Sequence, residues 1–142
     1  MWILLGIITA PWRSIPLYST HWTYFPGALL FATGMWIYKS SSREFSGVLL
    51  GGLPELRPDQ HQQRLVTSGI RSRVRHPIYL AHLCEMLGWS VGTGLAVCYA
   101  LTAFAVVTGA IMVRLEDKEL ERRFGEEYRT YRRNVPAVLP RI

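Results

Sequence analysis

The residues best suited to chemistry form two polar groups separated by an uncharged stretch. Arg75, His76 and Tyr79 surround a proline, and Glu116 and Asp117 follow further along the chain. An imidazole, a phenol and carboxylates are groups that hold a polar or cationic ligand by hydrogen bonds. The sequence shows no Cys/His cluster with metal-ligand spacing, no phosphate-binding glycine loop and no Ser-His-Asp order. These residue types therefore predict ligand binding and orientation rather than attack by a protein nucleophile.

The stretch between the two groups predicts a membrane hairpin. From Ile78 to Val113 the only formally charged residue is Glu85. A helix needs roughly 20 apolar residues to cross a bilayer, and the glycine-rich turn at 92–94 divides this stretch into two short antiparallel spans. The alternative is a buried hairpin of a soluble protein, but a chain of 142 residues has little other sequence to cover one. The hairpin would bring the two polar groups to the same side of the membrane.

Two further apolar stretches precede the hairpin. Tyr24 to Tyr38 is uncharged, with aromatic and basic residues at its ends, as expected at a membrane interface. Met1 to Trp12 is apolar but short, and no basic residue precedes Arg13, which favours a first membrane helix over a signal peptide. Whether 1–12 crosses completely is left open. The pattern predicts an all-α integral membrane helical bundle of about four transmembrane helices.

The basic residues predict the orientation of these spans. Of the 16 lysines and arginines, one lies between the first two predicted spans, seven between the second and third, and eight after the fourth. By the positive-inside rule, the middle loop and the tail face the cytoplasm. The net charge of +6 then indicates a surface facing anionic lipid, and no nucleic-acid partner is expected, because the arginines adjoin membrane spans.

Helical spacing gives some of these residues a specific place. Pro77 suits the first turn of the third span, where its missing N–H has no cost, and the free N–H groups there suit a carboxylate. Tyr79, His82, Glu85 and Trp89 follow at intervals of three, three and four and so share a face. An ionisable residue inside a membrane is costly and suggests function. Glu85, paired with His82, either lines an acceptor pocket or joins helices structurally.

The tail has the pattern of an amphipathic helix. Leu120, Phe124, Tyr128 and Tyr131 recur at helical spacing among charged residues. Such a C-terminal amphipathic helix lies on the membrane interface, either as an anchor alone or as a lid over a site. Cys84 and Cys98 lack ligand spacing and are predicted to be buried side chains without chemistry.

The order of these features resembles the isoprenylcysteine carboxyl methyltransferase and phospholipid methyltransferase superfamily. The resemblance runs from Arg64 to Ile142 and includes the polar motif at 75–79, the acids at 116 and 117, and the Val135-Pro136 ending. It implies a single membrane domain over 1–142 that uses S-adenosylmethionine to methylate a lipid or lipidated acceptor. It also implies that the active site faces the cytoplasm while the acceptor enters from the bilayer.

The resemblance also assigns residues to roles. Glu116 matches the first acid of the family's acidic pair and Asp117 the second. Gln63 and Arg71 stand where the family often has His and Tyr, and Met112 stands where the prenylcysteine enzymes place an arginine that holds the acceptor carboxylate. A C-terminal prenylcysteine is therefore not assumed as the substrate, and the candidate acceptor residues are Arg114 and Glu85. The implied cofactor-binding residues are Leu65, Val66, His76, Pro77, Ile78, Tyr79 and Glu116.

Two other functions fit part of the same pattern. Membrane enone and sterol reductases that use NADPH share the motif at 75–80, the Leu87-Gly88-Trp89 segment and the Val-Pro tail, but they are usually much longer. A non-catalytic membrane scaffold of the same fold is the other alternative. The acceptor and the oligomeric state remain open at this stage.

Overall fold

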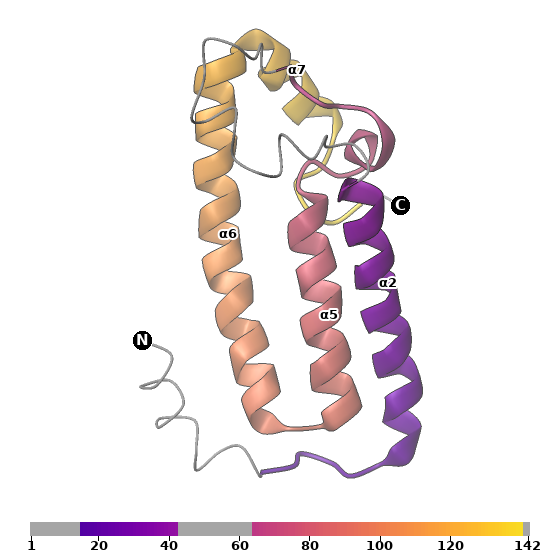
Figure 1. Cartoon of the computed structure of the whole chain (residues 1–142). Coiled ribbons are helices and arrows are strands. Elements are labelled where there is room, and N and C mark those ends of the chain that lie inside the picture. Colours follow the sequence, from indigo (N-terminus) through magenta and orange to yellow (C-terminus); the bar gives the residue numbers. More distant parts are fainter. Residues whose placement is uncertain (1–14, 43–63, 141–142) are drawn as a thin grey trace. The chain divides into compact units, whose positions relative to one another are not determined.

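The computed structural model describes residues 15–42 and 64–140, and this part of the chain is helical apart from turns and one isolated bridge. The predicted first span at 1–12 and Gln63 lie outside the described residues. The all-α prediction is confirmed for the part described (Figure 1). The helices are η2 (His21–Thr23), α2 (Tyr24–Ser42), η4 (Gly69–Ser72), α5 (Pro77–Thr93), α6 (Ala96–Phe124) and α7 (Glu126–Asn134).

The chain divides into two compact units, of which the first comprises Met1–Met35 and Ala81–Ile111. Within it, α2 packs closely on α5 through glycines. A Cβ added to Gly88 would lie 2.7 Å from the carbonyl oxygen of Gly27, and one added to Gly34 would lie 2.7 Å from that of Ala81. Membrane helices use such small residues because their backbones must approach closely to gain packing contacts.

The turn between α5 and α6 lies where the glycines at 92–94 predict it (Figure 1). Gly94 has a φ of +66°, which suits glycine, and its carbonyl oxygen accepts a hydrogen bond from the Leu17 N–H at 2.8 Å. The Tyr18 hydroxyl donates to the Val91 carbonyl oxygen at 2.8 Å and lies 2.7 Å from the Tyr99 hydroxyl. The segment before α2 is thereby fastened to the hairpin turn.

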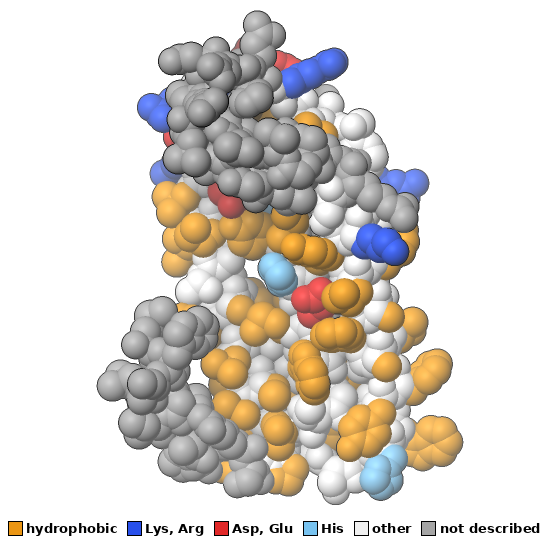
Figure 2. Space-filling model, viewed as in Figure 1, with side chains coloured by type: hydrophobic (Ala, Val, Ile, Leu, Met, Phe, Trp, Pro, Cys, Tyr) orange, Lys and Arg blue, Asp and Glu red, His pale blue; other side chains and the backbone are white. Residues whose placement is uncertain are grey.

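Helix α6 alone, among the described helices, is long and apolar enough to cross a membrane. Its uncharged part ends at Val113, and the helix continues through charged residues to Phe124. Helix α5 has 17 residues. Large apolar side chains are exposed along α2 and α6, and apolar side chains cover much of the helical face shown in Figure 2. An exposed apolar surface of this kind suits lipid contact.

The tail differs from the single amphipathic helix that its spacing predicts. Leu120 and Phe124 belong to the end of α6, whereas Tyr128 and Tyr131 belong to α7. The two helices meet at Gly125, whose φ of +57° is a left-handed conformation that favours glycine and ends a helix. Tyr128 is completely buried, so α7 contributes to the packed interior of the second unit.

The second unit comprises Trp36–Leu80 and Met112–Ile142. It contains η4, the first turn of α5, the charged end of α6, and α7. Its buried apolar side chains include Val74, Val113, Tyr128 and Val135, which come from four different segments. This small core surrounds the polar residues that the sequence singles out.

Candidate functional site

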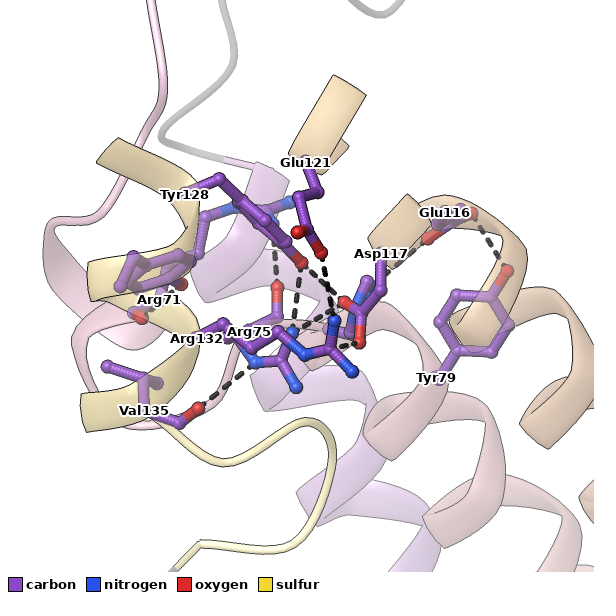
Figure 3. Close-up of polar contacts among 11 residues, drawn as sticks. Arg71, Arg75, Tyr79, Glu116, Asp117, Glu121, Tyr128, Arg132 and Val135 are labelled. Atoms are coloured by element: carbon purple, nitrogen blue, oxygen red, sulfur yellow. Dashed lines mark hydrogen bonds and ion pairs between the residues drawn. The ribbon is translucent and has the colours of Figure 1, made fainter. Parts of the chain in front are cut away.

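Asp117, on α6, is the centre of a buried polar cluster in the second unit (Figure 3). Its Oδ1 accepts a hydrogen bond from Arg75 Nη1 at 2.5 Å, lies 2.7 Å from His76 Nε2, and accepts a further bond from the Tyr128 hydroxyl. The Asp117 side chain is 7% exposed and that of His76 is 4% exposed. A carboxylate this buried is stable only because several donors replace water around it.

The C-terminal segment holds this cluster through backbone bonds. The N–H of Arg75 donates to the Pro136 carbonyl oxygen at 2.9 Å, and the N–H of His76 donates to that of Ala137 at 2.8 Å. Arg75 Nε donates to the Val135 carbonyl oxygen at 3.0 Å. These bonds fix the backbone of Arg75 and His76 immediately before α5 begins at Pro77.

Glu116 forms the accessible edge of the cluster. Its Oε2 lies 3.1 Å from His76 Nδ1, and its Oε1 accepts a hydrogen bond from the Tyr79 hydroxyl at 2.9 Å. The Glu116 side chain is 46% exposed, in contrast to the buried Asp117. A neutral imidazole carries one N–H and can donate to only one of the two carboxylates, whereas an imidazolium donates to both.

The surroundings shift the pKa values of the carboxyl groups downward. Burial raises the pKa of Asp117, but hydrogen bonds from Tyr128, His76 and Arg75 outweigh it and hold that pKa below its usual value. The hydrogen bond from His76 lowers the pKa of Glu116; burial opposes this effect, and the bond from Tyr79 adds to it. Both carboxylates are therefore ionised at neutral pH.

The structure brings together three of the predicted cofactor residues, namely His76, Tyr79 and Glu116. Pro77 is fully buried and begins α5 as predicted, and Ile78 follows it, partly buried. Leu65 and Val66 lie in an irregular stretch before η4, and no hydrogen bond or ion pair joins them to the cluster within the described residues.

Among the described residues, no hydrogen bond or ion pair joins the two predicted acceptor residues to the cluster. Arg114 is exposed on α6 and makes no ion pair with any described residue. Glu85 belongs to the first unit, where its Oε2 lies 3.4 Å from His82 Nδ1. The predicted contact is therefore present, but the His82 side chain is 58% exposed.

Sequence reasoning named Arg75 and Asp117 without predicting their contacts in the cluster, and it missed the part of Tyr128. The adjacency of Asp117 to Glu116 and of Arg75 to His76 was a usable signal for two of them. Tyr128 gave no such signal, because its spacing placed it on an apolar face. Within the described residues, no group of three or more acidic, His or Cys side chains could hold a metal ion.

Comparison with known proteins shows which family the chain resembles. The profile of the phospholipid methyltransferase family matches residues 22–127, which include α2, α5, α6 and the acidic pair. The chain is 36% identical over 93 residues to protein-S-isoprenylcysteine O-methyltransferase B of Arabidopsis thaliana, covering 62% of this chain and 45% of that protein.

Two other relatives match shorter stretches of the chain. Protein-S-isoprenylcysteine O-methyltransferase of Homo sapiens is 37% identical over 87 residues, covering 55% of this chain and 28% of its own length. Methanethiol S-methyltransferase of Pseudomonas deceptionensis is 36% identical over 69 residues, covering 49% of this chain and 26% of its own. The chain thus spans less than half the length of these relatives. No solved structure matches it closely.

Proposed function

Because the chain belongs to the phospholipid methyltransferase family, we propose that it is an S-adenosylmethionine-dependent methyltransferase acting on a lipid or lipidated acceptor. The observation that carries this proposal is the half-exposed Glu116 carboxylate, held by His76 and Tyr79 at the end of the apolar part of α6. It supplies a binding group for a cationic, hydroxyl-bearing cofactor next to a surface suited to lipid.

The residues present fit such a cofactor. Glu116 keeps lone pairs that can accept hydrogen bonds from an amino group or from ribose hydroxyls. Three donors already contact Oδ1 of Asp117, and the side chain is buried, so Asp117 is assigned to the scaffold of the site. His76, Pro77, Ile78 and Tyr79 would form one wall, with Leu65 and Val66 as further contacts.

When bound, S-adenosylmethionine supplies an electrophilic methyl group. A protein nucleophile is therefore unnecessary. The task of the protein is to hold the cofactor, to align the acceptor with it and to exclude water. Glu116 and His76 would hold the cofactor, and the buried cluster would keep both in place. We assign Arg114 and Glu85 to the acceptor, Arg114 as a clamp for an anionic group and Glu85 as a polar residue of its pocket.

We also propose that the chain is one membrane domain of about four transmembrane helices with its site on the cytoplasmic face. The apolar length of α6, the exposed apolar side chains of α2 and α6, and the glycine-mediated packing of α2 on α5 support it. The distribution of basic residues supports the orientation.

The names of the relatives allow two acceptor classes. Isoprenylcysteine enzymes methylate a lipidated group, and a methanethiol enzyme methylates a small thiol. The exposed apolar surface favours the lipidated class, because such an acceptor reaches the site from the bilayer. No bilayer is needed to deliver a small thiol.

Transfer of a radiolabelled methyl group tests the proposal. The full chain in lipid nanodiscs should transfer label from S-adenosylmethionine to a farnesylated cysteine or to phosphatidylethanolamine in preference to methanethiol. Transfer to methanethiol alone would replace the lipid acceptor with a small thiol. A preparation that binds the cofactor but transfers label to none of the three would favour the non-catalytic scaffold.

A further inference from the structure

We propose that Tyr128 is a positioning residue of the methyl-transfer site, acting through the Asp117 carboxylate on the His76 ring. This inference rests on the proposed function for its ligand but on the geometry of the cluster for its connections. Nothing in the family match assigns a role to Tyr128, which lies just beyond the matched residues 22–127.

The Tyr128 hydroxyl occupies a junction between two charged groups. It donates to Asp117 Oδ1 and accepts from Arg75 Nη1 at 2.9 Å, while Arg75 Nη1 itself reaches the same Oδ1. The guanidinium carbon of Arg75 also lies 5.9 Å from the centroid of the Tyr128 ring. The hydroxyl and the ring thus fix both the arginine and the carboxylate (Figure 3).

The positioning residues are buried, whereas Glu116, which faces the ligand, is half-exposed. Tyr128 is completely buried and the Asp117 side chain is 7% exposed, so neither is placed to touch a ligand. His76 connects the buried residues to the accessible one, because its Nε2 faces Asp117 and its Nδ1 faces the half-exposed Glu116. Movement of Asp117 therefore rotates or shifts the His76 ring and disturbs the position of Glu116.

The charged groups around Asp117 define how it responds to loss of a donor. Arg75 and His76 face it from the segment before α5, and Tyr128 faces it from α7. Arg132, also on α7, has its Nε 3.9 Å from Asp117 Oδ2, and Glu116 is its chain neighbour. A buried carboxylate that loses one donor is less stable in its ionised form, because no water replaces the bond.

The inference makes a prediction about acid sensitivity. An Asp117 with two donors in place of three takes up a proton at a higher pH. A protonated Asp117 no longer holds His76 as an anion would. Cofactor affinity should fall as the pH is lowered. Loss of the Tyr128 hydroxyl should therefore raise the pH at which this fall occurs, an effect that a purely structural role for Tyr128 does not require.

Tyr131 provides a matched control on the same helix. Its hydroxyl also makes a bond within the second unit, to the Arg71 carbonyl oxygen at 2.6 Å, and its ring lies edge-on to Tyr128 with centroids 6.0 Å apart. Tyr131→Phe thus removes one hydroxyl from α7 without removing a donor to Asp117. This variant shows how far loss of a tyrosine hydroxyl from α7 alters binding and stability when Asp117 keeps all its donors.

The experiment compares Tyr128→Phe with Tyr131→Phe in the full chain. We expect Tyr128→Phe to weaken S-adenosylhomocysteine binding by roughly threefold to tenfold at neutral pH. We also expect it to raise the pH at which the affinity falls on acidification. We expect Tyr131→Phe to change neither. Equal affinities in the two variants, with the same pH dependence of affinity, would overturn the proposal.

Nitrogen NMR of the His76 ring tests the connection without any ligand. Its ring-nitrogen signals should shift in Tyr128→Phe and stay unchanged in Tyr131→Phe, and a result without this difference would also overturn the proposal. If the wild type binds no S-adenosylhomocysteine but the signals shift as expected, the proposed function fails while the positioning role stands. Should Tyr128→Phe not fold, Asp117→Asn must produce the His76 shift, and an unchanged signal there overturns the proposal.

Discussion

His76 Nδ1 lies 3.1 Å from Glu116 Oε2, although α5 and the apolar part of α6 separate the two residues in sequence. The contact joins the motif before α5 to the acidic pair on α6. The two side chains are direct neighbours, so a ligand that engages Glu116 must share it with His76.

The first prediction concerns these two residues. His76→Ala and Glu116→Gln should each lower S-adenosylhomocysteine affinity roughly tenfold to a hundredfold, because hydrogen bonds involving a charged group are worth about 1.5–3 kcal/mol. The two effects should be non-additive in a double-mutant cycle, since the side chains touch. Calorimetric titration measures this. Fully additive effects would show that the two residues act independently. Arg114→Gln, outside the cluster, should retain cofactor affinity.

The second prediction concerns the C-terminal segment. A chain ending at Gly125 lacks Tyr128 and the carbonyl groups of Val135, Pro136 and Ala137 that hold Arg75 and His76. It should lose S-adenosylhomocysteine binding even if the hairpin still inserts. A chain ending at Pro140 is the control and should bind normally. Equal binding by both truncated chains would reduce the tail to an anchor.

The sequence predicts those parts of the site that depend on local sequence patterns, but not those that depend on contacts between distant segments. The hairpin turn follows from local glycines and from an uncharged stretch, and Glu116 follows from the order of motifs, so both are predictable. The connection of Tyr128 to Asp117 is not, because it depends on the helix break at Gly125 and on a backbone pairing between 75–76 and 136–137. Periodicity alone continues the helix through Gly125 and hides the break.

The third prediction concerns acid stability. Because the pKa of Asp117 is lowered in the folded protein, its contribution to stability is present above the unfolded value of about 3.9 and is lost as pH falls through the lower native value. The melting temperature should therefore drop below about pH 4. In Asp117→Asn, which cannot ionise at this position, the acid-dependent part should shrink. An identical pH dependence in the two proteins would contradict the assignment.

The fourth prediction concerns the packing of α2 on α5. Gly88→Ala should destabilise the chain by about 1–3 kcal/mol, because the new Cβ would lie 2.7 Å from the backbone oxygen of Gly27. Gly92→Ala is the control in the same helix, where the nearest atom would lie 3.9 Å away. It should be neutral or stabilising, since alanine favours helix. Thermal unfolding in detergent compares them, and equal melting temperatures would exclude close α2–α5 packing at Gly88.

The most direct measurement is calorimetric titration of the detergent-purified full chain with S-adenosylhomocysteine and, separately, with NADPH. The Glu116–His76 site should bind S-adenosylhomocysteine, roughly tenfold to a hundredfold more weakly in Glu116→Gln, while NADPH gives no specific heat. Binding of NADPH without S-adenosylhomocysteine would contradict the methyltransferase account and support a reductase, and binding of neither would support a scaffold.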